Sequence, residues 1–194
     1  PDRLMIPVSR EVFEKIAVRE HSGGVIAVAE QKVHPLDNLE LDRNPLILVL
    51  ESVEKPGNLG ALLRTADAAG VTAVICCDSQ TDLYNPNVVR SSLGALFTRQ
   101  IAIATSGETI QWLKEKQIRI YCTHLEASDP YHKADYTGPC ALVMGTESTG
   151  LSREWTQHSD QNIIIPMKGV VDSLNVSVSA AIMIYEALRQ RGFR

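Results

Sequence analysis

Two turns in the last third of the chain carry the residues best suited to chemistry. Each turn follows a short apolar run, at 141–144 in one case and at 163–167 in the other, and each precedes a helical pattern. The first turn is rich in glycine, serine and threonine, and the second ends in Ser173-Leu-Asn-Val-Ser177. Buried strands that open into loops before helices form the ligand-binding edge of an open α/β sheet. We therefore expect the two turns to form one site.

A third candidate segment follows the first predicted strand and contains Asn58 and Arg64. Asn58 suits the N-cap of a helix, and Gly70 suits its C′ terminator. Arg64 lies off the apolar stripe of that helix, which consists of Leu59, Leu62, Leu63 and Ala66. Both polar residues can face a ligand at the strand ends. The alternatives are a plain N-cap for Asn58 and a surface ion pair with Asp67 for Arg64.

Several familiar ligand-binding patterns are absent or incomplete. Gly145 and Gly150 have the spacing of a phosphate-binding P-loop, but Leu151 occupies the position of the required lysine. No G-x-G-x-x-G pattern is present, and the histidines and cysteines lack the spacing of zinc ligands. The sequence therefore disfavours a nucleoside triphosphate, a dinucleotide or a metal ion as the ligand.

Strand and helix patterns alternate from residue 45 onward. This alternation predicts an α/β fold with a mostly parallel sheet and helices on both faces. We expect strands at 46–50, 72–76, 100–104, 118–122, 141–144 and 163–166, and helices at 59–69, 86–96, 108–116, 152–158 and from the second turn to about 191.

The first 44 residues do not continue this alternation of strands and helices. They contain a short helical pattern at 11–16, a strand-like run at 24–29 and a polar link with two prolines. This segment buries too little apolar surface to fold alone. The chain also begins at Pro1 without an initiator Met, so we expect a fragment whose first residues are the tail of a separate domain or an edge packed on the main one.

Composition narrows the class of protein. The 194 residues are 44% hydrophobic and 22% charged, with no apolar run long enough to span a membrane and no signal pattern, so we expect a cytoplasmic protein without membrane contact. A net charge of −4 argues against coating nucleic acid by bulk electrostatics but leaves room for a local basic groove. Four cysteines without paired spacing are expected to be buried free thiols.

Taken together, the three segments resemble the SpoU (TrmH-like) family of the SPOUT superfamily, RNA ribose 2′-O-methyltransferases that use S-adenosylmethionine. The resemblance covers about residues 45–191. It implies a SPOUT fold with a C-terminal trefoil knot, which is an exception to the usual absence of threaded loops, and a homodimer. It also implies that 1–44 is the remnant of an N-terminal RNA-binding domain plus linker, and that 45–194 is the SPOUT methyltransferase domain. The matching motifs are Asn58-Leu-Gly-Ala-Leu-Leu-Arg64, Met144-Gly-Thr-Glu147 with Gly150-Leu151, and Ile165-Pro-Met167 with Ser173-Leu-Asn-Val-Ser177.

The same resemblance implies roles for individual residues. Arg64 is expected beside the target ribose and phosphate, where a guanidinium that stays protonated acts as a clamp rather than as a base. Glu147 is expected to orient Arg64 or Asn58, and Ser173 and Asn175 complete the catalytic set. The residues expected to bind the cofactor are Met144, Gly145, Ile165, Pro166, Met167 and Leu174.

Each of these roles has a structural alternative. Glu147 can be a loop carboxylate beside the next helix, and Ser173 or Asn175 can simply cap the last helix. From the residues alone, Ile165 and Leu174 would be assigned to the core. The last helix carries an apolar stripe that belongs either to the core or, as the family implies, to the dimer contact: Val178, Ala181, Ile182, Tyr185 and Leu188.

The expected function is S-adenosylmethionine-dependent methylation of a ribose 2′-hydroxyl in ribosomal or transfer RNA by a homodimer. RNA is favoured over DNA because only RNA offers that hydroxyl. A non-catalytic RNA-binding or assembly protein that retains the fold is the main alternative, and a different small-molecule α/β enzyme is a weaker one.

Overall fold

A computed structural model describes residues 5–18, 23–125, 128–146 and 148–193. The chain divides into two compact units between Lys32 and Val33. In the first unit, helix α1 (Arg10–Ile16) begins at Ser9, whose hydroxyl accepts a hydrogen bond from the Val12 backbone N–H at 3.3 Å. No residue of α1 is buried. The predicted strand at 24–29 is wrong, because that segment lies without a paired neighbour among the described residues and a strand requires a hydrogen-bonded ladder.

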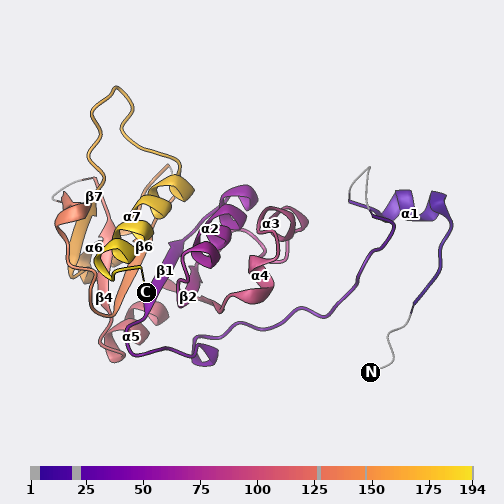
Figure 1. The fold of residues 1–194 in the computed structure, drawn as a ribbon, viewed down its shortest axis with the longest axis horizontal. Coiled ribbons are helices and arrows are strands. Elements are labelled where there is room, and N and C mark those ends of the chain that lie inside the picture. Colours follow the sequence, from indigo (N-terminus) through magenta and orange to yellow (C-terminus); the bar gives the residue numbers. More distant parts are fainter. Residues whose placement is uncertain (1–4, 19–22, 126–127, 147, 194) are drawn as a thin grey trace. The chain divides into compact units, whose positions relative to one another are not determined.

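The second unit is built on a seven-stranded sheet (Figure 1) with the strand order β3-β2-β1-β6-β4-β7-β5. All strand pairs are parallel, as predicted. The strands are β1 (Leu46–Glu51), β2 (Ala73–Cys77), β3 (Ile101–Ala104), β4 (Arg119–Thr123), β5 (Asp129–Pro130), β6 (Cys140–Met144) and β7 (Gln161–Ile164).

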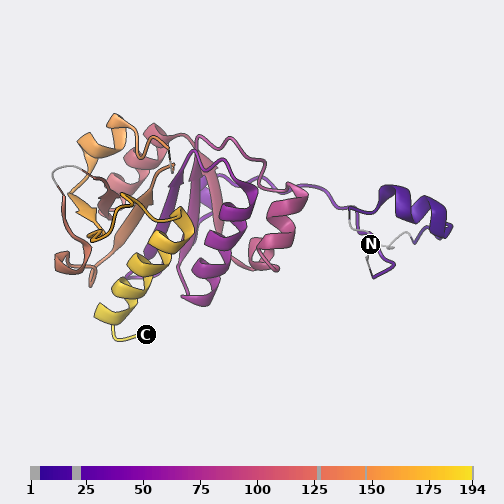
Figure 2. The same cartoon turned by 90° about the horizontal axis from the view of Figure 1, so that it is seen from above.

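Helices cover both faces of this sheet, which confirms the predicted fold class (Figure 2). Side chains of β1 alternate between two hydrophobic clusters, with Leu48 in one and Val49 in the other. The first cluster contains residues of α2, α3, α4 and α7, and the second contains residues of α5 and α6. The trefoil knot stays a prediction. The α-helices of this unit are α2 (Pro56–Ala68), α3 (Pro86–Ser91), α4 (Ala95–Thr98), α5 (Ser106–Glu115), α6 (Arg153–His158) and α7 (Val176–Gln190).

Two predicted helix boundaries are wrong for identifiable reasons. Helix α2 begins at Pro56, a residue whose fixed φ suits the first turn, so Asn58 lies inside the helix and is not its N-cap. The helix predicted at 86–96 breaks into α3 and α4, because Leu93 and Gly94 both adopt positive φ angles, 51° and 96°. Gly70, with φ 65°, follows the C-cap Ala69 as expected of a C′ residue.

Residues 33–44 pack against the sheet and belong to the second unit. The Ile103 N–H donates to the His34 carbonyl at 2.7 Å, and Gln100 exchanges hydrogen bonds with the backbone of Glu40. Leu36, Leu39 and Leu41 lie against the second hydrophobic cluster. The second compact unit therefore begins at Val33, and the domain division after residue 44 stays a prediction.

Gly60 allows α2 to approach α3 closely. A Cβ atom at this position would lie 1.9 Å from Ser91 Oγ and 2.8 Å from the Ser92 backbone nitrogen. We expect Gly60→Ala to lower the free energy of unfolding by about 2 kcal/mol or more, because the helices must separate. Urea unfolding measures the loss. Gly57→Ala on the same helix is the control, because a Cβ there meets nothing within 4 Å, and an equal loss in both variants would contradict this account.

All four cysteines are free and buried, as predicted. Burial raises the pKa of the thiols of Cys76, Cys77 and Cys122 to about 12. Because the thiolate is the reactive form, we expect no reaction of the native protein with a disulfide reagent at pH 8, and four equivalents of reaction in urea. A fast-reacting thiol in the native protein would contradict the described burial.

Candidate active site at the carboxyl ends of the strands

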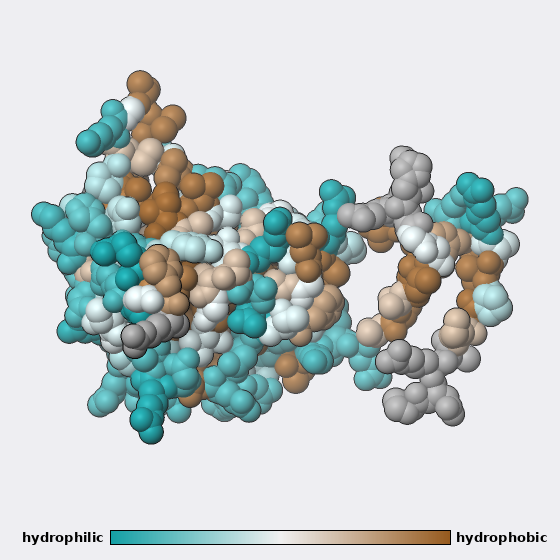
Figure 3. Space-filling view, viewed as in Figure 1, coloured by the Kyte–Doolittle hydropathy of each residue, from teal (hydrophilic) through white to brown (hydrophobic). Residues whose placement is uncertain are grey.

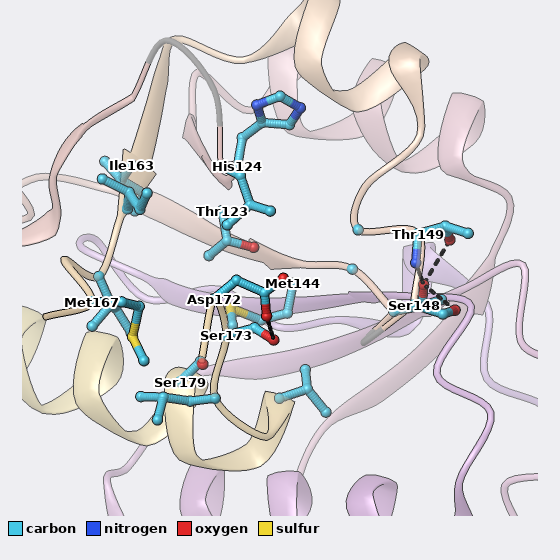
Figure 4. A pocket seen from close by; sticks show the side chains of 18 residues that line it. Thr123, His124, Met144, Ser148, Thr149, Ile163, Met167, Asp172, Ser173 and Ser179 are labelled. Atoms are coloured by element: carbon cyan, nitrogen blue, oxygen red, sulfur yellow. Dashed lines mark hydrogen bonds between the residues drawn. The ribbon is translucent and has the colours of Figure 1, made fainter. Parts of the chain in front are cut away.

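A cavity of about 460 Å³ lies where strands β4, β6 and β7 end (Figure 4). Five of the predicted cofactor residues line it: Met144, Gly145, Ile165, Met167 and Leu174. Pro166 is exposed and is not among the lining residues. Cavities of this size with mostly apolar walls and a few polar groups are typical of small-molecule sites. The structure therefore brings the two predicted turns together around one hollow.

The first turn is held by its own hydrogen bonds. Thr146 and Gly150 form an antiparallel bridge, with both N–H···O distances at 3.2 Å. Thr146 Oγ1 accepts from the Thr149 N–H at 3.0 Å and lies 2.7 Å from Thr149 Oγ1. A Cβ atom at Gly145 would lie 2.3 Å from the Gly150 carbonyl carbon, so only glycine lets the two ends of the turn meet. Glu147, at the centre of this turn, lies outside the described residues.

The second turn leads into α7 through Asn175. The Asn175 Oδ1 accepts hydrogen bonds from the Ser177 N–H at 3.0 Å and from its hydroxyl at 2.6 Å, so Asn175 is the N-cap of α7. Ser173 lines the cavity and donates its hydroxyl to Asp172 Oδ1 at 3.0 Å, and therefore does not cap this helix in the described structure. The capping alternative holds for Asn175, which is also available to a second partner through its amide nitrogen.

That second partner is Asn58. Asn175 Nδ2 donates to Asn58 Oδ1 at 3.2 Å, although the two residues are 117 positions apart in the sequence. Asn58 lines a smaller cavity of about 130 Å³, which shares Gly145, Thr146, Ser148 and Val176 with the larger one. All three predicted motifs therefore meet at adjoining hollows.

Arg64 is the exception. It is exposed, lines neither cavity, and its guanidinium has no hydrogen-bond or ion-pair partner within the described part of the chain. The alternative of an ion pair with Asp67 is wrong, since Asp67 Oδ1 lies 2.8 Å from Arg99 Nε instead. Arg64 is six residues beyond Asn58 on α2, so it points about 120° away from it around the helix axis.

Sequence reasoning missed part of the cavity wall. Thr123 and His124, at the end of β4, line the larger cavity together with Asp172 and Ser179 (Figure 4). Thr123 Oγ1 donates to the Val143 carbonyl at 3.0 Å, which ties β4 to β6 beside the first turn. The signal available was the position of these residues at a strand end, but nothing in the sequence places β4 between β6 and β7.

The composition of the larger cavity suits an adenosine derivative. Met144, Ile163 and Ile165 supply an apolar wall, while backbone groups near Gly145 and the hydroxyls of the first turn supply hydrogen-bond partners. Among the described residues, no group of three or more His, Cys, Asp or Glu side chains is arranged to hold a metal ion. No described helix is long and apolar enough to cross a membrane.

Comparison with known proteins identifies the family of the chain. The family model described as SpoU rRNA Methylase matches residues 45–185. The 23S rRNA (guanosine-2′-O-)-methyltransferase RlmB of Ralstonia nicotianae is 39% identical over 192 residues, covering 96% of this chain and 77% of its own. Its counterpart of the same name from Pectobacterium atrosepticum is 41% identical over 180 residues, covering 89% and 72%.

Solved structures of methyltransferases are also similar to this chain. The AdoMet-bound rRNA methyltransferase from Sinorhizobium meliloti superposes with a TM-score of 0.88 at 33% identity, covering 93% of this chain and 70% of its own. The SpoU methyltransferase AviRb from Streptomyces viridochromogenes, in complex with AdoMet, gives 0.79 at 32% identity, with 85% and 68% covered. The chain therefore belongs to the SpoU rRNA methylase family, which confirms the predicted S-adenosylmethionine-dependent RNA ribose 2′-O-methyltransferase.

Proposed function

We propose that this enzyme methylates the ribose 2′-hydroxyl of a guanosine in 23S rRNA, and that it does so in the cytoplasm as a homodimer. The relatives with the highest identity quoted above are named for that nucleotide in that RNA. The main structural support for the proposal is the hydrogen bond between Asn58 and Asn175 beside a cavity suited to the cofactor.

In this proposal the larger cavity holds the cofactor. Backbone groups of Gly145, Ile165 and Leu174 bind the adenosine, and Met144 and Met167 pack against it. Pro166 is assigned a supporting role, because its fixed φ restrains the start of the second turn. The smaller cavity, which is next to the larger one and contains Asn58, receives the target ribose.

Bound S-adenosylmethionine supplies an already activated methyl group. The tasks left to the protein are to place the weakly acidic 2′-hydroxyl in line with that methyl group and to stabilise charge as the proton leaves. Asn58 and Asn175 restrain each other and can position the ribose, with Ser173 and Glu147 as further polar groups of the catalytic set. Arg64 contributes a fixed positive charge and a planar fork for the RNA phosphate.

The position of Arg64 favours a dimer in which each site uses a second copy of the chain. Arg64 lies outside both cavities of its own chain, so another copy has to present it if it is to reach the cofactor. Helix α7 buries Val176, Ala180, Met183, Ile184 and Ala187. All five residues of the predicted stripe are partly or fully exposed, with Val178 48% and Tyr185 46% exposed. Leu188 also packs against the first hydrophobic cluster, but the exposed part of the stripe fits a subunit contact.

The loop between β7 and α7 supports the same arrangement. It extends away from the body of the second unit (Figure 1), and its outer end is hydrophobic (Figure 3). Val170 and Val171 are 106% and 63% exposed. Apolar side chains on a projecting cofactor loop are stabilised when a second subunit covers them.

For the domain organisation, we propose that the first unit is part of an RNA-binding domain and that the methyltransferase domain starts within the segment 33–45. The hydrogen bonds of His34 to Ile103 in β3 and of Glu40 to Gln100, just before β3, support the earlier start.

The proposal is tested by incubating the protein with labelled S-adenosylmethionine and total RNA from a strain whose ribosomes lack the modification. We expect label in 23S rRNA, on the 2′-oxygen of one guanosine. A substrate with 2′-deoxyguanosine at that position is the matched control and is expected to remain unlabelled. Label found only in tRNA would contradict the proposed substrate, and cofactor binding without any label would favour the non-catalytic alternative.

A further inference from the structure

Strand β1 ends in a buried carboxylate that no part of the proposed chemistry uses. Glu51 is 6% exposed, whereas the other residues of β1 are all apolar. Glu51 Oε2 accepts a hydrogen bond from the Ser152 backbone N–H at 2.7 Å, and Oε1 lies 3.3 Å from Ser106 Oγ. Within the described residues no lysine or arginine pairs with it.

A buried carboxylate destabilises the fold unless its hydrogen bonds offset the cost of burial. Removing a carboxylate from water costs free energy, which an apolar residue at the end of this strand would avoid. The short bond to Ser152 is charge-assisted and is the stronger of the two contacts. The Ser106 hydroxyl is shared, because it also donates to Asp78 Oδ2 at 2.6 Å and accepts from Trp155 Nε1 at 2.8 Å.

Glu51 does not line the cofactor cavity, and its hydrogen bond to Ser152 links it to the turn that does. Ser152 follows Leu151, which is buried in the second hydrophobic cluster and marks the end of the first turn. Residues of that turn, including Gly145, Thr146 and Gly150, line the cavity, whereas Glu51 and Ser152 do not. The start of the turn is fixed by β6, and its end is fixed by Leu151 and by the Glu51 carboxylate.

We infer that Glu51 is a positioning residue for S-adenosylmethionine: it holds the end of the 145–151 turn in the shape that binds the cofactor. This inference rests on the assignment of the larger cavity to the cofactor. It predicts that loss of the Glu51–Ser152 bond weakens cofactor binding, while loss of the Glu51–Ser106 contact does not.

Three variants separate the two contacts. Glu51→Ala removes both. Ser152→Pro removes the N–H donor together with a hydroxyl that makes no capping bond, whereas Ser152 already has φ −62° and its carbonyl still accepts from Thr156. Ser106→Ala removes the hydroxyl that contacts Glu51 and leaves the Glu51–Ser152 bond intact. By calorimetry we expect Glu51→Ala and Ser152→Pro to bind S-adenosylmethionine about tenfold more weakly than wild type, and Ser106→Ala within about twofold.

Hydrogen exchange in the cofactor-free protein gives a second readout. Amides of residues 148–151 are expected to exchange faster in Glu51→Ala and Ser152→Pro but not in Ser106→Ala. Glu51→Gln keeps the size and one acceptor, so it is expected to restore most of the affinity. If Glu51→Ala does not fold, Ser152→Pro carries the test.

The outcomes are distinguishable. Wild-type affinity in both Glu51→Ala and Ser152→Pro would overturn the inference, as would an equal loss in Ser106→Ala, which would indicate a general effect on the core. If Glu51→Ala does not fold, wild-type affinity and exchange in Ser152→Pro would overturn it. Failure of the wild-type protein to bind the cofactor would instead overturn the assignment of the cavity.

Discussion

Replacing Gly145 with alanine is expected to reduce the affinity for S-adenosylmethionine about a hundredfold or more. The added Cβ would lie 2.3 Å from the Gly150 carbonyl carbon and 2.5 Å from the Leu151 nitrogen. These are backbone atoms, so no side-chain rotation relieves the clash. The turn has to open, and the wall of the larger cavity opens with it. Isothermal calorimetry measures the loss.

Gly138→Ala is the matched control for this experiment. It is the same chemical change at a position where a Cβ meets nothing within 4 Å and which does not line the cavity. We expect the control to bind the cofactor as wild type does. Retained affinity in Gly145→Ala would show that the turn tolerates a side chain and would remove it from the cofactor site.

The sequence was sufficient to predict the layered fold, because the apolar pattern of each strand and helix depends only on neighbouring residues. Apolar runs such as β1 and the stripe of α2 report which residues face a core, and the parallel arrangement follows from their alternation. The apolar pattern gave wrong predictions where backbone conformation or strand pairing determines the secondary structure. The left-handed conformation of Leu93 splits a helix whose apolar periodicity continues through it, and the run at 24–29 has strand composition without a partner strand.

The candidate site was predictable only where a motif signalled it. Gly145 and Asn175 were found because their segments resemble a family, and the structure adds the bond that joins Asn175 to Asn58. His124 was missed because strand order is a long-range property that composition does not encode. Glu51 was missed because a carboxylate at a strand end looks exposed in the sequence, and only the fold shows that it is buried.

Arg64→Ala is expected to reduce methyl transfer by about a hundredfold to a thousandfold while leaving cofactor affinity unchanged. The reason is that Arg64 lines neither cavity, so its removal spares the cofactor, whereas its charge is needed at the ribose in the proposed reaction. Single-turnover assays and calorimetry measure the two quantities. Arg43→Ala is the control, because Arg43 is exposed just before β1, at the amino end of the strands. Normal turnover in Arg64→Ala would exclude the role.

A mixture of two inactive variants tests whether Arg64 acts across the proposed dimer. Arg64→Ala retains an intact cavity, and Gly145→Ala retains an intact Arg64, so a mixed dimer contains one complete site only if the arginine comes from the second subunit. After denaturation and joint refolding, random pairing is expected to restore about a quarter of the wild-type activity. If Arg64 serves the cavity of its own chain, the mixture stays inactive, and the proposed route of Arg64 to the ribose is wrong.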